Sequence, residues 1–235
     1  MYASLQEENN LKTRISNSGL MLCILSLGCL ILISTVLYRK AHHPQHKNVQ
    51  TQAAQSDTLA AIAIQPLAPC NAAHVESVRR VLMQRFRVEV TVLPAVTLPK
   101  DAYYRPRNRY RAETILTWLE THTDPRFVKI VGMTDSDISI TKGNVYDWGV
   151  FGLGTMGART CVISTFRLGG NSRRGQERLE KVALHETGHT FGLPHCQTQS
   201  CLMNDYLGSI HTVDQDTDFC ERCKGLLGHN LRQRW

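Results

Sequence analysis

The chain has 235 residues, of which 42% are hydrophobic and 20% are charged, a balance typical of a globular protein with one core of moderate size. The formal net charge of +7 would suit an anionic membrane surface or nucleic acid. No block of basic residues dominates the sequence, so nucleic acid is not expected as a partner.

An uncharged apolar segment stands near the N-terminus. Residues 15–38 (ISNSGLMLCILSLGCLILISTVLY) contain no charged side chain. At about 1.5 Å per helical residue their apolar part reaches roughly 30 Å, the thickness of bilayer hydrocarbon. A cleaved signal peptide normally has a shorter apolar stretch that ends at small residues, whereas this one ends at Tyr38 and two basic residues. We therefore expect an N-terminal tail over residues 1–18 and one retained transmembrane helix over residues 19–38, making a single-pass membrane protein.

The flanks of this segment are polar. Basic residues occur on both sides of it, so the rule of positive charge on the cytoplasmic side does not decide the orientation. Residues 39–59 are rich in Gln and His and lack a sustained apolar period, as expected of a linker. His42, His43 and His46 in this linker are interpreted as solvated rather than as a metal-binding tract. Lipid attachment at Cys29 is disfavoured, because cleavage there would leave the apolar LILISTVLY at the new N-terminus.

From residue 60 onward the apolar pattern is that of a folded domain. The helix candidates are residues 71–86, 109–122 and about 173–191. After a short apolar run at 61–67, the strand candidates are residues 88–94, 127–134, 149–157 and 160–168. Strands that alternate with helices predict an α/β (α+β) fold, in which helices pack on a mixed twisted sheet.

The stretch HETGHTFGLPH, residues 185–195, crowds metal-ligand side chains into one short segment. If the last long helix includes it, His185 and His189 lie one turn apart on one face and can share a metal ion. Gly192 can adopt the positive φ that ends a helix, and the following proline cannot continue one. The chain should therefore turn sharply, so that His195 returns as a third ligand.

This pattern predicts a catalytic zinc site. Three neutral imidazoles leave a tetrahedral zinc ion with one open position for water. Glu186 follows His185 by about 100° around the helix, where its carboxylate can deprotonate that water and pass the proton to a leaving amine. The alternative is a set of surface histidines on an amphipathic helix. That alternative fits His185 and His189 alone but not their combination with Gly192 and His195.

The same residues resemble a known family. HETGHTFGLPH has the extended zinc signature of the metzincin peptidases, and HCQTQSCLM (195–203) together with FCERC (219–223) resembles the archaemetzincin branch. The resemblance covers about residues 60–226. It implies a metzincin-like zincin domain over residues 60–235, with an active-site helix and a small zinc-bound subdomain at the C-terminus. It also implies a second, structural zinc ion.

Four late cysteines suit that second zinc on chemical grounds as well. Cys196 and Cys201 form one pair, Cys220 and Cys223 form another, and four thiolates make a closed tetrahedral site. Because Cys196 follows His195 directly, this metal would hold the segment after the third catalytic ligand in shape. Two disulfides are the alternative, favoured if the domain faces an oxidising compartment. Thiolates kept for zinc mildly favour the cytoplasmic face.

Met203 resembles the methionine that metzincins place in a turn beneath the catalytic zinc, although on spacing alone it would be an ordinary core residue. Tyr206 falls three residues after Met203 rather than the two seen in metzincins that use such a tyrosine, so it is assigned no role. The resemblance also implies that residues 149–157 (GVFGLGTMG) form an exposed edge strand along which an extended substrate can pair.

Two further groups of residues are interpreted without a catalytic role. A basic cluster interleaved with tyrosines precedes the helix candidate at 109–122 and comprises Arg105, Arg107, Arg109 and Arg111. We interpret this cluster as part of a solvent-exposed face rather than as a phosphate-binding site. It could instead attract acidic peptides to the protein. Cys70 and Cys161 stand apart from both metal motifs and are expected to be buried free thiols.

The sequence thus predicts a membrane-anchored zinc metallopeptidase that holds two zinc ions per chain and acts on peptides or proteins. Two alternatives remain: another zinc-dependent amide hydrolase, and a zinc-stabilised binding module or scaffold without turnover. No motif in the sequence encodes peptide preference, or the choice between internal cleavage and trimming from an end.

Overall fold

The computed structural model describes residues 60–234. The predicted tail, transmembrane helix and linker, residues 1–18, 19–38 and 39–59, lie outside this range. Among residues 60–234, none of the helices has the length and apolar character needed to cross a bilayer.

Strands and helices alternate along the described chain. The strands are β1 (Ala60–Ala68), β2 (Val90–Val92), β3 (Val96–Thr97), β4 (Tyr103–Tyr104), β5 (Arg109–Arg111), β6 (Phe127–Thr134), β7 (Ile138–Lys142), β8 (Val145–Val150), β9 (Gly152–Gly154) and β10 (Thr160–Ser164). The helices are α2 (Ala72–Phe86), α3 (Ala112–His122), α4 (Arg173–Thr190), α5 (Ile210–Gln215) and α6 (Glu221–Arg234). Two short 3-10 turns are η1 (Lys100–Ala102) and η2 (Arg105–Arg107).

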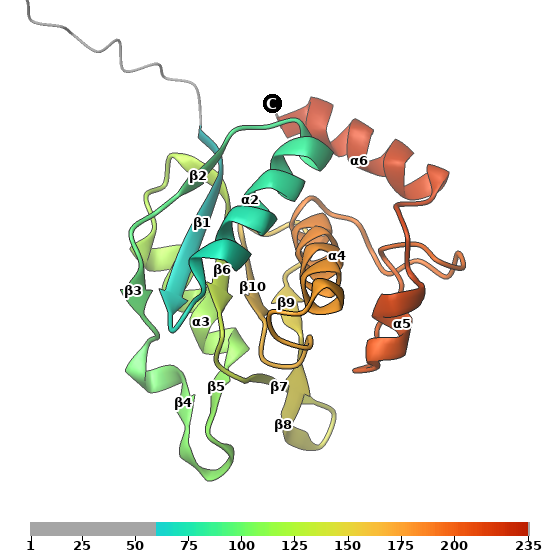
Figure 1. Cartoon of the computed structure of the whole chain (residues 1–235). Helices are drawn as coiled ribbons and strands as arrows, with labels where there is room; N and C mark the ends of the chain where they lie inside the picture. The colour runs from blue at the N-terminus through green and yellow to red at the C-terminus, as the bar shows by residue number, and fades with distance from the viewer. Residues whose placement is uncertain (1–59, 235) are drawn as a thin grey trace, which may run out of the picture. The chain divides into compact units, whose positions relative to one another are not determined.

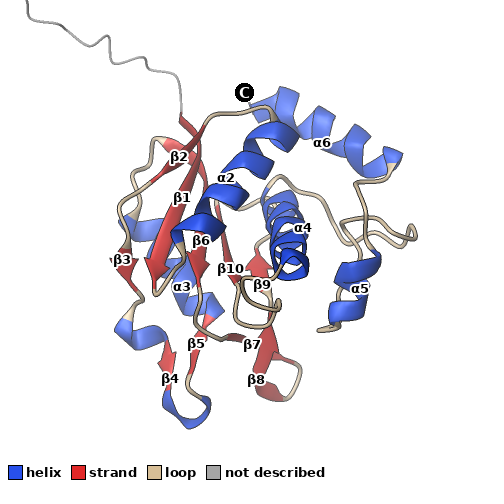
Figure 2. Ribbon diagram, in the orientation of Figure 1, coloured by secondary structure: helices blue, strands red, loops and turns tan. Residues whose placement is uncertain are grey.

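The main sheet has the strand order β2-β1-β6-β10-β9, and β3 also pairs with β1. Strands β2, β1, β6 and β10 run parallel, whereas β9 is antiparallel to β10 at the edge. Helices α2 and α4 cover one face of this sheet and α3 covers the other (Figures 1 and 2). The predicted mixed α/β fold is therefore confirmed.

Side-chain alternation along the buried strands produces a core on each face of the sheet. In β1, Ile62 and Ile64 pack in the cluster that contains Leu179 of α4, whereas Ala63 packs in the cluster that contains Ile115 of α3. Both faces of these parallel strands are covered, so their sequences are nearly continuous apolar runs. At the edge, β9 pairs with β10 and lies against α4.

A second sheet, in the order β4-β5-β7-β8, was not expected. Its hairpin β7–β8 is half exposed and has no long apolar run, so the periodicity did not reveal it. Residues 149–157 form two strands rather than one, because β8 pairs with β7 and β9 pairs with β10. Residues 109–111 belong to β5 rather than to a helix, because they pair with β4 and β7.

Helix α4 begins at Arg173, as expected, and ends one residue before the predicted end. The chain beyond it adds α5 and α6, which the sequence did not predict. Helix α6 lies across the C-terminal end of α4, and its Asn230 side chain donates a hydrogen bond to the Phe191 carbonyl oxygen (2.8 Å). The C-terminal helix α6 therefore contacts the C-terminal end of α4, the helix that carries His185 and His189.

Candidate metal centre and active site

Helix α4 positions the candidate zinc ligands, and local sequence fixes both of its ends. The Ser172 side chain caps its first turn by accepting a backbone N–H (3.0 Å). At the other end, Gly192 has φ +85° and its N–H donates to the His189 carbonyl oxygen (2.8 Å). The chain reverses at this glycine, and the reversal carries His195 back towards the helix.

The three histidines of the motif lie together. The ring centroid of His185 is 4.6 Å from that of His189 and 5.4 Å from that of His195, and the last two are 4.8 Å apart. One potential ligand atom from each lies within 4.8 Å of the others. His185 and His189 are buried, whereas the side chain of His195 is 48% exposed. The cluster is therefore anchored in the core and open to solvent on one side.

The hydrogen bonds of the two buried histidines show that a cation fits between them. Nδ1 of His185 lies 2.6 Å from the Leu202 carbonyl oxygen, and Nδ1 of His189 lies 2.8 Å from the Leu193 carbonyl oxygen. A carbonyl oxygen only accepts, so each Nδ1 carries the proton and each neutral ring has a lone pair on Nε2. The two Nε2 atoms are 3.0 Å apart.

Burial, reinforced by nearby histidines, lowers the pKa of both rings and keeps them neutral. Two facing lone pairs at this separation repel each other unless a cation lies against both. Zinc binds imidazole nitrogens at about 2.0–2.1 Å, which places two tetrahedral ligand atoms about 3.3 Å apart. The residues present therefore fit a zinc ion.

His195 has a different partner for its second ring nitrogen. Its Nδ1 lies 3.8 Å from Oδ2 of Asp205, a residue that the sequence reasoning did not single out. Metal-binding histidines commonly direct the ring nitrogen that does not bind metal to a carbonyl or carboxylate, which fixes the orientation of the ring. Backbone carbonyl groups fill this position for His185 and His189, and a side-chain carboxylate lies near it for His195.

Glu186 is buried beside the histidines and faces β9. Its carboxylate accepts a hydrogen bond from the Gly154 backbone N–H, and burial raises its pKa to about 8 against the effect of that bond. A Cβ on Gly152 would lie 2.6 Å from Cγ of Glu186. At Gly154, a Cβ would lie 3.1 Å from Cβ of His189. Only glycine lets the β9 backbone approach the helix this closely.

Met203 packs beneath the helix between the two buried histidines. It is fully buried, and a Cβ on Gly188 would lie 2.8 Å from its sulfur atom. The Tyr206 ring lies 4.2 Å from the His185 ring, and its hydroxyl points to the Leu202 carbonyl oxygen at 3.5 Å. Tyr206, for which the sequence predicts no role, therefore packs against a candidate ligand.

A cleft of about 410 Å³ opens over these residues. Its walls come from β8, β9 and the segment after Met203, and they include Trp148, Leu153, Met156 and Leu207. The histidines and Glu186 lie along this cleft. It is mainly apolar, with the candidate catalytic groups as a polar cluster in its wall, as is usual for a ligand site.

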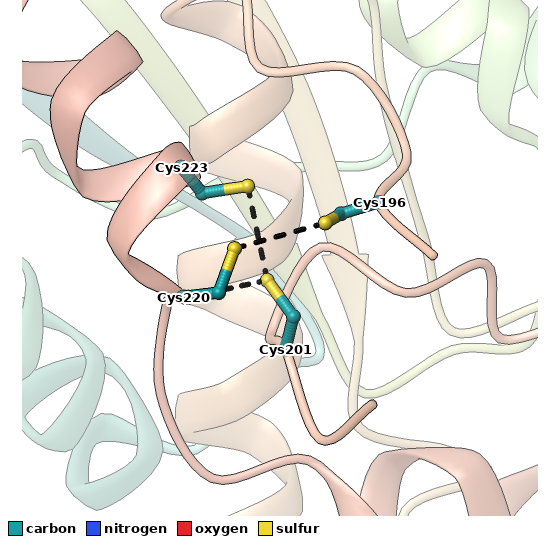
Figure 3. A group of neighbouring side chains, drawn as sticks. All are labelled: Cys196, Cys201, Cys220 and Cys223. Atoms are coloured by element: carbon teal, nitrogen blue, oxygen red, sulfur yellow. Dashed lines mark hydrogen bonds between the residues drawn. The ribbon is translucent and has the colours of Figure 1, made fainter. Parts of the chain in front are cut away.

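The four late cysteines also come together (Figure 3). The sulfur of Cys196 lies 3.7 Å from that of Cys220, and the sulfur of Cys201 lies 3.8 Å from that of Cys223. All four are free thiols, so the alternative of two disulfides does not match this geometry. Four thiolates at about 2.3 Å from a tetrahedral zinc ion lie about 3.8 Å from one another. The sulfur positions therefore fit zinc.

The thiols of this cluster have unlike pKa values. The Cys223 backbone N–H lowers the pKa of the Cys220 thiol to about 6, whereas burial raises the pKa of Cys223. Outside the cluster, Cys161 is buried and Cys70 is partly buried, and burial raises the pKa of Cys70 to about 12. Both are free thiols, but only Cys161 has the full burial that was expected of the two.

The cysteine cluster adjoins the histidine cluster through the backbone. The Cys196 N–H donates to the Met203 carbonyl oxygen (2.8 Å), and the Leu202 N–H donates to the Asp218 carbonyl oxygen (3.0 Å). Leu202 in turn offers the carbonyl oxygen that orients His185. The segment that the cysteines hold is therefore the one that supports the candidate catalytic histidines.

The site combines two histidines one helical turn apart, a third histidine beyond a glycine turn and a buried glutamate beside β9. This combination is typical of zinc metallopeptidases. Residues 72–229 match the model of peptidase family M54. The archaemetzincin of Archaeoglobus fulgidus is 36% identical over 164 residues, which are 69% of this chain and 95% of the relative. That of Methanopyrus kandleri is 34% identical over 138 residues, 58% of this chain and 75% of the relative.

Solved structures agree with this assignment. The crystal structure of the Archaeoglobus fulgidus archaemetzincin, complexed with malonate, has a TM-score of 0.62 at 34% identity and covers 71% of this chain and 99% of its own. The Methanopyrus kandleri structure has a TM-score of 0.65 at 28% identity and covers 76% and 98%. The chain therefore belongs to peptidase family M54, the archaemetzincins, and is a zinc metallopeptidase, as the resemblance implied.

Proposed function

We propose that this chain hydrolyses peptide bonds at one zinc ion held by His185, His189 and His195, with Glu186 as general base and then general acid. The observation that carries the proposal is the pair of Nε2 lone pairs that face each other at 3.0 Å beside the buried Glu186 carboxylate. A divalent cation removes their repulsion. The donor set of three neutral imidazoles suits zinc with one open position.

Bound zinc supplies Lewis-acid polarisation of the substrate carbonyl and lowers the pKa of a coordinated water towards about 7. The positive charge of a bound zinc ion would favour the ionised form of Glu186 against the effect of burial. The Glu186 carboxylate would then accept the proton of the attacking water, while the Gly154 N–H keeps that carboxylate in place. Protonated Glu186 then donates to the nitrogen of the leaving amine, so the C–N bond breaks with a neutral amine as product. Glu186 is only 5% exposed, and it lines the cleft that the substrate would enter.

The substrate backbone has an edge to pair with. Within residues 60–234, β9 pairs with β10 along one side only, and its other side faces the cleft that holds Glu186. An extended peptide can add to such an edge by main-chain hydrogen bonds. A peptide added in this way would place its scissile carbonyl beside Glu186, because Gly152 and Gly154 of β9 contact the Glu186 side chain.

We also propose a second, structural zinc on Cys196, Cys201, Cys220 and Cys223. The support is the separation of 3.7–3.8 Å between paired sulfurs. Four protein ligands close a zinc site to water, so this ion would take no part in the reaction. Its part would be to hold residues 196–203 against the histidine cluster.

Metal content and cleavage test the proposal together. Purified full-length protein should contain two zinc ions per chain and should cleave a peptide library, and Glu186→Ala should retain both ions but lose cleavage. Glu177→Ala, which changes an exposed glutamate of the same helix, is the matched control and should keep cleavage. A protein that holds two zinc ions yet shows no Glu186-dependent cleavage would be a binding module or scaffold instead.

Residues 19–38 are proposed to anchor the chain in a bilayer, with residues 39–59 as the tether of the catalytic domain. The support is the length of the uncharged apolar run. The full-length chain should stay with membranes after alkaline extraction, and replacing Leu27 and Leu30 by arginine should release it. Reporter fusions after Lys40 would show which side the domain faces.

A further inference from the structure

A second cavity, of about 710 Å³, lies next to the cleft that holds Glu186. The two share Trp148 and Gly208 in their walls, so they are immediate neighbours. The second cavity is formed by η2, β5, β8 and the residue Arg167 that follows β10. Its lining includes Tyr104, Arg107, Arg109, Tyr146 and Arg167.

Arginines in this cavity outnumber the carboxylates that pair with them. Arg109 contacts both carboxylates, since its Nε lies 2.7 Å from Asp137 and its Nη1 lies 3.2 Å from Asp147. Arg167 directs Nε and Nη2 at the same Asp137, each at 2.7 Å. Arg107 reaches only Asp147, at 3.5 Å. Three guanidinium groups thus share two carboxylates, and one positive charge is left over.

Free donors remain on all three of these arginines within residues 60–234, and on Arg109 the free atom is Nη2. Nη1 of Arg167, and both Nη atoms of Arg107, make no hydrogen bond within residues 60–234. The Arg107 side chain is 62% exposed. The Arg167 guanidinium is held flat against the backbone of Gly149, where a Cβ would lie 2.6 Å from its Cζ. The free donor of Arg167 is therefore fixed in the wall, whereas those of Arg107 lie on an exposed side chain.

The arginine cluster noted in the sequence divides by role in the structure. Arg109 and Arg111 are structural, and Arg111 is buried against Glu113, Ser139 and Thr141. Arg105 is exposed and does not line the cavity. Of this cluster, Arg107 keeps the most free donors at the cavity, and Arg167, which lines the same cavity, comes from a distant part of the chain.

Aromatic side chains complete the cavity. Tyr146 and Trp148 are both partly exposed large aromatics, and Lys142 lies over the Trp148 ring at 5.1 Å from Nζ to the centroid. Lys142 lines the first cleft, so positive charge continues from one cavity towards the other. Guanidinium donors suit a planar carboxylate, and flanking aromatic rings can cover the methylene groups that carry it.

We propose that this cavity binds a carboxylate of the peptide substrate, from an acidic side chain or from the C-terminus, and that the enzyme therefore prefers peptides that place a carboxylate there. The proposal rests on the proposed peptidase function, because it makes the cavity a distal subsite of the same cleft. Binding in the ground state and the transition state alike would lower KM and leave kcat nearly unchanged.

Binding to a chain that cannot turn over tests the subsite directly. The probes are labelled peptides that differ only by Glu or Gln at successive positions, and by a free or amidated C-terminus. They are titrated into full-length Glu186→Ala protein, and fluorescence anisotropy measures their binding. At least one carboxylate should improve binding about tenfold at low salt, and the position in the series identifies its source. Arg107→Glu should abolish the preference.

Arg105→Glu is the matched control, since it makes the same charge change on the same 3-10 turn but outside the cavity. It should leave the preference intact. Equal binding of the Glu, Gln, acid and amide peptides would overturn the proposal, and so would a preference that survives both Arg107→Glu and Arg167→Gln.

Cleavage assays with the wild-type chain distinguish a failure of the carboxylate subsite from a failure of the proposed peptidase function. Glu186-dependent cleavage with no preference for Glu over Gln and none for a free over an amidated C-terminus would reject the subsite and leave the peptidase function standing. Absence of Glu186-dependent cleavage would reject the peptidase function, while the titrations would still decide whether the cavity binds a carboxylate.

Discussion

The Glu186 carboxylate lies against the backbone of Gly152, so closely that a Cβ on Gly152 would be 2.8 Å from Oε1 and 2.6 Å from Cγ. A real side chain never tolerates such contacts, and here the neighbour is the proposed general base. The absence of a side chain at residue 152 is therefore a requirement of the site.

Gly152→Ala is expected to push the Glu186 carboxylate away from the reacting atoms. Displacement of about 1 Å at a catalytic group can cost about 10²-fold in rate, so kcat should fall by at least that much while zinc content stays unchanged. Steady-state kinetics with metal analysis checks both. Gly225→Ala, where a Cβ in α6 meets nothing within 4 Å, should keep full activity. Equal activity of both variants would contradict the prediction.

Asp205→Asn is expected to weaken metal binding without unfolding the chain. The Asp205 carboxylate lies 3.8 Å from Nδ1 of His195, and both side chains are about half exposed. Loss of such a partner typically reduces metal affinity about 10–100-fold. Competition with a chromogenic chelator measures the affinity of the first site. Asp101→Asn, an exposed aspartate of η1, is the control, and an unchanged affinity for Asp205→Asn would rule out this role.

Cys223→Ser is expected to reduce the zinc content from two ions to one and to lower catalytic activity as well. The reason is structural, because the segment between Cys196 and Met203 also supplies the Leu202 carbonyl that orients His185. Metal analysis and thermal unfolding of the variant give the two readouts. Cys70→Ser changes a free thiol outside the cluster and should keep both ions. Retention of two zinc ions in Cys223→Ser would exclude the second site.

The sequence predicted the helix that carries the candidate ligands more closely than it predicted the fold around that helix. The ends of α4 depend on Ser172 and Gly192, which act within a few residues, so the sequence located them. The contact of Gly152 and Gly154 with Glu186 depends on how β9 registers against β10, and sequence spacing carries no information on that. The same reason explains why Asp205 was missed.

The β7–β8 hairpin and helix α6 were also not predicted, because neither shows a strong apolar period. The hairpin is stabilised by charged groups instead: Asp147 on β8 pairs with Arg109 on β5, and Asp137 just before β7 pairs with Arg109 and Arg167. Helix α6 is attached through Cys223, Asn230 and the buried Leu227. Contacts of this kind join residues far apart in the chain, so periodicity within one segment does not reveal them.

Asp214→Asn is expected to destabilise the fold by roughly 1–2 kcal/mol at neutral pH, after allowance for partial exposure. Its carboxylate receives hydrogen bonds from Arg178 at 2.7 and 2.8 Å and from Arg174 at 2.9 Å, and these lower the pKa of Asp214 to about 2. This pair joins α5 to α4, the helix of the candidate ligands. Urea unfolding at pH 7 measures the loss, and Glu177→Gln, an exposed pair on the same helix, should leave the free energy of unfolding almost unchanged.

The sign of the pH dependence follows from the direction of that shift. The folded pKa of Asp214 lies below its ordinary value of 3.8, so its contribution is complete above about pH 4 and is lost as the pH falls towards 2. The difference between the wild-type chain and Asp214→Asn should therefore be constant from pH 5 to pH 8. It should then narrow in more acidic solution. A difference that widens on acidification, or a variant as stable as the wild type at pH 7, would show that the Arg178–Asp214 pair does not stabilise this junction.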